Sequence, residues 1–240
     1  MTESNSIMQS LWIGESLSAM EQLCIASFLH HGHAFHLYAY GEVAGAPQGT
    51  AILDANEIIP ADKIFRYQNG SFSGFSNFFR FKLLLDRGGW WVDLDMVCLK
   101  PFDFLTAYVF SAEFDGDACV PNSGAIKAPR GSDFSRYCWE VCQSKDSAQL
   151  RWGETGPRLV GEALQELGLQ GYLQGPETFC PIRYRSWEQV LDPEFNMQWD
   201  RNTRAVHLWQ ELWRRNRRDK NQRYPPKCLY EQLRSAYLDP

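Results

Sequence analysis

The sequence contains no apolar run that approaches the roughly 18 residues needed for a helix to span a bilayer. Its N-terminus also lacks the basic region and the following apolar region that mark a secretory signal. Both absences argue against export and against a membrane-spanning helix. We therefore expect a cytoplasmic protein.

Cysteine pairing motifs are absent as well. The chain has seven cysteines, an odd number, and none of them forms a Cys-x-x-Cys pattern. Several lie inside apolar runs, which favours reduced thiols in the core and agrees with a cytoplasmic protein.

Two common signatures of phosphate and nucleic-acid binding are missing too. No glycine-rich phosphate loop follows the first predicted strand, and no recognition motif for nucleic acid accompanies the formal net charge of −5. Positive charge gathers in residues 201–227, where nine Lys or Arg residues stand against two acidic residues. This basic segment is interpreted either as a solvated helix face or as a surface that contacts anionic lipid headgroups.

The most informative stretch that is present reads SNFFRFKLLLDRGGWWVDLDMVCLKP and covers residues 76–101. Ser76 is a candidate N-cap for a helix over residues 77–86, and Gly88 with Gly89 supplies a left-handed stop. Residues 90–94 are apolar and predict a strand. Side chains two apart on a strand share one face, so we expect Asp93 and Asp95 to lie together.

Two neighbouring carboxylates at the end of a buried strand repel each other unless a cation neutralises them. Oxygen ligands favour Mn²⁺ or Mg²⁺, which commonly bind substrate phosphates at the same time. Asn77 and Arg80 are three residues apart on the predicted helix and therefore lie on one face, where both could reach the same ligand.

The remaining sequence predicts an α/β fold. A strand over residues 7–13, a helix over 17–31 and a strand over 35–40 form a β-α-β opening, which favours a parallel sheet with its ligand beyond the carboxyl ends of the strands. Further strands are expected over residues 51–59, 108–114 and 124–128. Further helices are expected over residues 132–145, 157–167 and 227–238.

The order of Asn77, Arg80, the double glycine, an aromatic residue, Asp-x-Asp and Lys-Pro resembles the DXD-containing glycosyltransferase family, which has a GT-A fold. Relatives in that family include α-mannosyl- and α-1,4-sugar transferases and the catalytic domains of glucosylating bacterial toxins. The resemblance implies one GT-A domain over residues 1–240, with a Rossmann-like mixed sheet flanked by helices. A basic helical extension would begin near residue 210.

The resemblance also implies roles for residues at the predicted pocket. Trp12, Ile13 and Gly14 would contact the base of the donor nucleotide. Asn77 and Arg80 would bind the donor sugar or phosphate, although the family usually has Asp at the position of Asn77.

In the same way, Asp93, Asp95 and Arg80 would form the catalytic set, with Asp93 also contacting the donor. His207 would join the two aspartates as the third metal ligand. Asn122 would hold the donor sugar or the acceptor, and Trp213 would belong to a loop that covers the donor.

Together these roles describe a metal-dependent, retaining glycosyltransferase that moves a sugar from a nucleotide-diphosphate donor, with a UDP-sugar expected, to a saccharide or lipid-linked acceptor. Polysaccharide biosynthesis at the inner face of the membrane would follow from the family. Two alternatives remain open. Asp93 and Asp95 also fit the Asp-x-Asp motif of haloacid-dehalogenase-type phosphatases, and Asn77 would suit a nucleotide-sugar-binding protein without turnover.

Overall fold

The computed structural model describes residues 7–239, and its centre is a six-stranded mixed sheet in the order β3-β2-β1-β4-β7-β6. Strands β1 (Ile7–Trp12), β2 (Ala34–Ala39), β3 (Thr50–Asp54) and β4 (Gly89–Val92) are parallel. Strands β7 (Ala118–Ala128) and β6 (Val109–Asp115) complete the sheet in antiparallel pairing. A separate antiparallel pair joins β5 (Met96–Cys98) to β8 (Ala205–His207).

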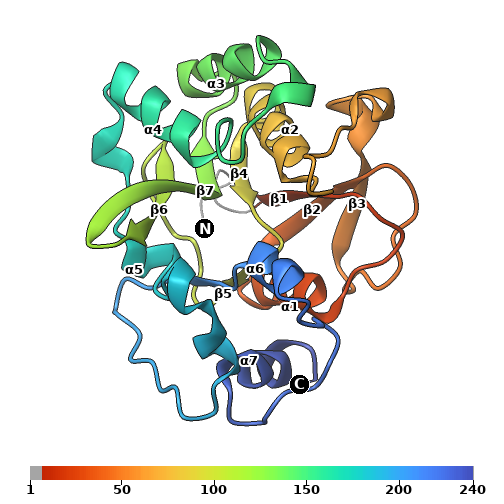
Figure 1. The fold of residues 1–240 in the computed structure, drawn as a ribbon, viewed down its shortest axis with the longest axis vertical. Coiled ribbons are helices and arrows are strands. Elements are labelled where there is room, and N and C mark those ends of the chain that lie inside the picture. Colours follow the sequence, from red (N-terminus) through yellow and green to blue (C-terminus); the bar gives the residue numbers. More distant parts are fainter. Residues whose placement is uncertain (1–6, 240) are drawn as a thin grey trace.

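Helices cover both faces of this sheet (Figure 1). One core contains α2 (Ser73–Asp86), α3 (Asp133–Gln143) and α4 (Pro157–Glu166), and the other contains α1 (Ala19–His30) and α7 (Leu229–Tyr237). Trp90 and Trp91 are successive residues of β4, so they point to opposite faces, and each is buried in a different one of the two cores. The short helices α5 (Pro176–Phe179) and α6 (Gln210–Arg215) contribute buried residues to the core that contains α1 and α7.

The helix that precedes the aspartate motif begins earlier than predicted. α2 starts at Ser73 and its N-cap is Phe72, so Ser76 lies inside the helix, where its backbone N–H donates to Phe72 O at 2.9 Å. The predicted stop is confirmed, because Gly88 and Gly89 have φ values of 68° and 86°. These left-handed conformations turn the chain from α2 directly into β4.

The predicted shared strand face for Asp93 and Asp95 was wrong. β4 ends at Val92, and the two aspartates lie in a turn closed by the Met96 N–H donating to Asp93 O at 3.1 Å. The strand therefore ends where the buried apolar run ends, at Val92. The turn between β4 and β5 brings the two carboxylates together.

Two other strand boundaries differ from the sequence prediction. The strand predicted over residues 51–59 ends at Asp54, whose carboxylate accepts from the Asn56 N–H and begins a 3₁₀ helix over Ala55–Glu57. The strand predicted over residues 124–128 is longer than expected, because β7 begins at Ala118 and includes residues 121–123. Pro121 is tolerated there because the β6–β7 register shifts between Phe110 and Ala112.

The C-terminal residues are part of the same packed structure. Tyr230 is fully buried in the core that contains α1, and Cys228 and Leu233 belong to the same cluster. All seven cysteines are unpaired and six of them are buried, whereas Cys119 is exposed. Within residues 7–239, no helix has both the length and the apolar character needed to cross a membrane.

Candidate active site

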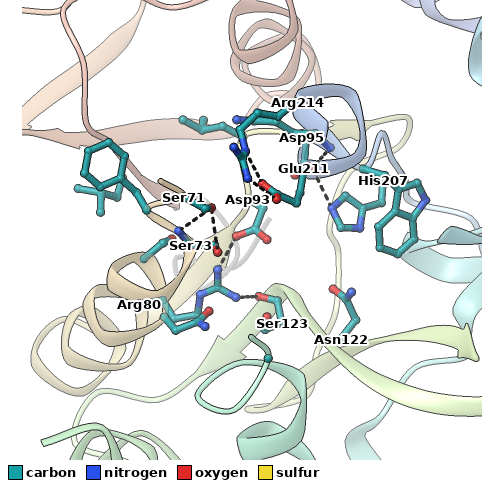
Figure 2. A pocket seen from close by; sticks show the side chains of 18 of the residues that line it. Ser71, Ser73, Arg80, Asp93, Asp95, Asn122, Ser123, His207, Glu211 and Arg214 are labelled. Carbon is teal, nitrogen blue, oxygen red and sulfur yellow. Dashed lines mark hydrogen bonds and ion pairs between the residues drawn. The ribbon is translucent and has the colours of Figure 1, made fainter. Parts of the chain in front are cut away.

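A pocket of about 410 Å³ opens where β1 and β4 end, and the aspartate motif lies in its wall (Figure 2). Its other walls come from α2, from the strands β6 and β7, and from the segment between β8 and α6. In Figure 2, Ser71 and Ser73 lie on one side of Asp93, and His207 and Asn122 lie on the other. The carboxyl ends of parallel strands are the usual ligand site in open α/β sheets, and the sequence predicted this position.

Asp93 is fixed by two donors on a single oxygen. Arg80 Nη2 and Trp91 Nε1 each donate to Asp93 Oδ1 at 2.8 Å. Arg80 also donates to the Ser123 carbonyl and lies 4.9 Å from the centre of the Trp91 ring. Burial raises the pKa of Asp93 above its ordinary value, although the Arg80 charge opposes this shift.

Asp95 connects the aspartate motif to the segment that follows β8. Its Oδ2 lies 3.1 Å from His207 Nε2 and accepts from the Gln210 N–H at 2.7 Å, while its carbonyl accepts from the Leu208 N–H. Burial alone would lower the pKa of His207, but the Asp95 carboxylate raises it well above its ordinary value. Conversely, burial would raise the pKa of Asp95, but His207 brings it below its ordinary value.

The three predicted metal-binding residues do come together. One ligand atom from each of Asp93, Asp95 and His207 lies within 4.8 Å of the others, and these are the only such group among the described residues 7–239. Asp93 Oδ2 is not used by Arg80 or Trp91, so an oxygen remains for a cation. Two carboxylates with one imidazole fit Mn²⁺ better than Mg²⁺, because imidazole is the softer ligand.

Asn77 and Arg80 both line the pocket from α2, as predicted from their spacing. The Asn77 amide donates to Thr155 Oγ1 at 3.5 Å, and a side chain at Gly156 would approach that amide to 3.1 Å. Asn77 is thus packed against the segment that leads into α4. Arg80 Nε is buried without a hydrogen-bond partner among the described residues.

Asn122 reaches the pocket from within β7. Its Oδ1 accepts from the Gly124 N–H at 2.6 Å, and its Nδ2 donates to Glu113 Oε1 at 3.2 Å. Glycine is required at position 124 because a side chain there would come within 2.8 Å of Asn122 Oδ1. Asn122 therefore holds Glu113 at the pocket wall.

The predicted base-binding residues lie at the end of β1, and two of the three line the pocket. Trp12 and Ile13 belong to the pocket wall, whereas Gly14 does not. A side chain at Gly14 would approach Trp12 Nε1 to 3.1 Å, so the glycine lets the chain pass close to this edge of the indole. Within the described structure, Trp12 Nε1 has no hydrogen-bond partner.

The structure places Trp213 in the core and not in a loop over the donor. Trp213 is fully buried in α6, donates to the Leu208 carbonyl at 2.9 Å and contacts Tyr230 at a ring distance of 4.8 Å. Of the two tryptophans that follow His207, Trp209 is the one that lines the pocket, and its ring centre lies 4.0 Å from that of His207. Trp209 has a left-handed φ of 59°, which turns the chain from β8 into α6.

Sequence reasoning missed several other side chains of the pocket. Glu113 and Tyr184 extend the wall beyond His207, and Glu211 with Arg214 forms an ion pair at 2.7 Å on α6. Glu113 is the first charged residue of β6 and follows four buried residues, and this break in the buried run could have indicated it. Tyr184 lies in a 3₁₀ segment over Tyr184–Leu191, called η6 here, whose sequence carries no motif.

Comparison with known proteins supports the interpretation of the aspartate motif. Residues 13–111 match the family model described as "Glycosyltransferase sugar-binding region containing DXD motif". No curated protein sequence matches the chain. The match confirms the resemblance based on residues 77–101, and with the mixed sheet it confirms an α/β fold of GT-A type.

Solved structures with a similar fold include a PaToxG glycosyltransferase and a mutant transferase. The first has 16% sequence identity over 70% of this chain and 74% of that chain, with a TM-score of 0.49. The second has 9% identity over 68% of this chain and 85% of that chain, with a TM-score of 0.43. Residues 13–111, which include Arg80, Asp93 and Asp95, thus match the DXD-type sugar-binding region of glycosyltransferases, and this match supports a glycosyltransferase enzyme.

Proposed function

We propose that the protein is a metal-dependent, retaining glycosyltransferase that transfers a sugar from a nucleotide-diphosphate donor to a saccharide or lipid-linked acceptor hydroxyl. The observation that supports this most directly is the convergence of Asp93, Asp95 and His207 on one point of the pocket wall. Arg80 lies beside that point as a buried cation. Two acids, an imidazole and an arginine suit a metal-bound diphosphate.

When bound, Mn²⁺ or Mg²⁺ would neutralise the charge that develops on the departing diphosphate. The chain itself keeps the ligand atoms in place before any substrate arrives. Arg80 and Trp91 orient Asp93, while the Gln210 N–H orients Asp95. This arrangement lowers the reorganisation needed when the donor binds.

The donor is proposed to extend from the aspartate motif toward the end of β1. Trp12 and Ile13 would contact the base, with a UDP-sugar as the expected donor, and Asn77 with Arg80 would contact the sugar or phosphate. Asn77 provides an acceptor oxygen and two N–H donors without a charge, so the preferred sugar would differ from that of relatives with Asp. Retention of anomeric configuration is proposed from the family resemblance.

A cytoplasmic location with peripheral contact at the inner face of the membrane belongs to the same proposal. Most of the basic segment is already used within the protein: Arg204, Arg214, Arg215, Arg218, Lys220 and Arg223 all form ion pairs. The cations that would be left for lipid headgroups are Arg201, Arg217 and Lys227. A role in polysaccharide biosynthesis would supply a lipid-linked acceptor there.

Release of nucleoside diphosphate from UDP- and GDP-sugars, with and without Mn²⁺, tests the proposal. We expect release only with Mn²⁺, and loss of release in Asp93→Asn and His207→Gln. Asp62→Asn, which changes an exposed aspartate, should keep wild-type activity. The configuration of the product, followed by NMR, tests retention.

The same assay separates the two alternative functions. Hydrolysis of a phosphomonoester with Mg²⁺, together with no release from any nucleotide sugar, would favour the phosphatase. Binding of a nucleotide sugar without hydrolysis or transfer would favour a binding protein.

A further inference from the structure

We propose that Glu113, Tyr184 and Trp209 form the acceptor subsite and that the acceptor bound there is a saccharide. This inference rests on the proposed transferase function, because it assumes that a donor occupies the other end of the pocket. It assigns a substrate class and three residues that neither the motif nor the family match singles out.

The aspartate motif divides the pocket into two ends. Trp12 and Ile13 lie at one end, where β1 stops. Glu113 belongs to strand β6, Tyr184 to segment η6, and Trp209 is the N-cap of α6. All three line the pocket on the side of the motif that also contains His207. A donor whose diphosphate is at the motif and whose base is at β1 leaves this second end for the acceptor.

Glu113 is the carboxylate at this end that keeps an oxygen for a ligand. Asn122 Nδ2 donates to its Oε1, whereas Oε2 has no partner among the described residues. Glu211, the other glutamate of the pocket, is occupied by Arg214 and Arg215 at 2.7 and 2.8 Å. A fixed carboxylate oxygen beside an open pocket is suited to accept a hydrogen bond from a hydroxyl.

Two aromatic residues line the same pocket as this carboxylate. Tyr184 meets Trp209 edge to face at a ring distance of 5.6 Å, and 38% of the tyrosine surface is exposed. Trp209 is held by its Nε1, which donates to the Ile182 carbonyl at 2.9 Å. Exposed aromatic surface beside a hydrogen-bonding carboxylate matches a sugar, which has C–H groups on its ring faces and hydroxyls around its edge.

The wall that carries these residues is fixed to the sheet. Arg183 donates to the Gly116 carbonyl and lies 4.4 Å from the centre of the Phe114 ring. Arg183 and Phe114 are each the chain neighbour of a pocket residue, so the contact between them fixes segment η6 to strand β6, from which Tyr184 and Glu113 line the pocket. The subsite is therefore formed before an acceptor arrives, which lowers the cost of binding.

The test compares transfer with hydrolysis, using the hydrolysable donor and Mn²⁺. Methyl glycosides of glucose, galactose, mannose and N-acetylglucosamine are offered as acceptors, and a peptide rich in Ser, Thr and Tyr is the competing hydroxyl source. At least one glycoside should accelerate nucleotide release above hydrolysis, and the peptide should not. Glu113→Gln and Tyr184→Ala should each raise the acceptor KM by about tenfold, which should exceed any change that they cause in donor hydrolysis.

Two matched controls exclude general damage. Trp199→Ala removes an aromatic residue of similar exposure, 37%, that does not line the pocket. Glu188→Gln alters a glutamate of η6 that pairs with Arg218 outside the pocket. Both controls should keep the wild-type acceptor KM.

The outcomes separate this inference from the proposed function. Acceleration by the peptide alone, or by none of the glycosides, would overturn the saccharide assignment. An unchanged acceptor KM in both pocket variants, or a parallel loss of hydrolysis, would overturn the subsite. Wild-type protein that neither binds nor hydrolyses any nucleotide sugar would instead overturn the transferase function itself.

Discussion

Arg80 connects helix α2 to the aspartate motif and to the neighbouring strands β4 and β7. Its guanidinium contacts the Asp93 carboxylate, the Ser123 carbonyl and the face of Trp91, and the residue is 3% exposed. A planar fork with several N–H groups can make these contacts together, whereas an ammonium group cannot. Arg80 thus has a structural role in addition to its proposed contact with the donor.

Arg80→Lys should lower the free energy of unfolding by about 1–3 kcal/mol, because one buried hydrogen bond and the ring contact are lost while the charge remains. The measurement is urea unfolding of the metal-free protein. The same substitution at the exposed Arg158 of α4 should change this free energy by no more than about 0.5 kcal/mol. Equal effects at the two positions would contradict the assigned role.

The Asp95–His207 pair predicts a pH dependence of stability without metal. The pKa of His207 is raised, so its contribution is complete below its unfolded value of about 6.5 and is lost as pH rises through the folded pKa. The pKa of Asp95 is lowered, so its contribution is present above about 3.9 and is lost as pH falls through the folded pKa. Urea unfolding with a chelator should therefore show declining stability on the alkaline side.

His207→Gln should remove that alkaline decline, and Mn²⁺ should reverse it in the wild-type protein, because a metal ligand must be neutral imidazole. A variant profile parallel to the wild-type profile would show that another group causes the decline.

At the scale of single residues, the sequence predicted the metal group but not the acceptor side. Asp93, Asp95 and His207 have types and a local order that indicate a metal. Glu113 and Tyr184 line one pocket but come from segments far apart in the chain, which meet where Arg183 packs on Phe114.

The prediction that Trp213 belongs to a loop over the donor was wrong for a related reason. The sequence favours Trp213 as the residue that covers the donor, whereas Trp209 lines the pocket and Trp213 is buried. Burial of one tryptophan in a short helix depends on what packs around that helix, here Tyr230 of α7. The local order of residues carries no information about that contact.

Among the elements, the turn from α2 into β4 positions the aspartate motif. Gly88 follows the C-cap of α2, with a left-handed φ of 68°, and a side chain there would meet Arg130 N at 2.4 Å. Gly168 has the same place after α4, with a φ of 65°, and a Cβ added there would meet no atom within 4 Å. The two glycines therefore differ in the space around them and not in backbone conformation.

Gly168→Ala should cost about 1–2 kcal/mol of unfolding free energy, because a residue with a Cβ would have to adopt a left-handed conformation. Gly88→Ala should cost clearly more, because the backbone of Arg130 would have to move, and donor hydrolysis should fall as the motif shifts. Denaturant unfolding and the release assay measure the two effects. Equal stability losses would show that backbone conformation alone explains both glycines.

Element types were predicted better than element ends. The helices and strands with strong apolar patterns occur where the sequence placed them. The errors lie at α2, β3, β4 and β7, where tertiary contacts decide the boundary. Pro121 and Gly124 are typical of a turn, yet pairing with β6 extends the strand through them.

For the whole molecule, the residues after 210 are packed as part of the fold. Lys220 pairs with the buried Glu21 of α1, and the Asn221 side chain accepts from the Ala19 N–H at the start of that helix. Tyr230 of α7 is fully buried against Trp213. The residues after 210 thus include the helices α6 and α7, and most of the basic side chains there pair with acids of the protein.

Deleting residues 229–240 should abolish cooperative unfolding, because loss of one large buried aromatic residue costs about 3–5 kcal/mol and whole domains are stable by only about 5–15 kcal/mol. A deletion of residues 239–240, which keeps α7, should retain a single transition. Circular dichroism during thermal unfolding measures this. Cooperative unfolding of the longer deletion would show that α7 is an accessory element.

The central claim is that this pocket binds a nucleotide sugar together with a metal at Asp93, Asp95 and His207. The most direct test is the thermal stability of the protein with UDP- and GDP-sugars, each with and without Mn²⁺, because a ligand of the native state raises the unfolding temperature. We expect one donor to raise it only when Mn²⁺ is present, and Asp95→Asn to lose this shift. A shift that is independent of Mn²⁺, or that persists in Asp95→Asn, would contradict the claim.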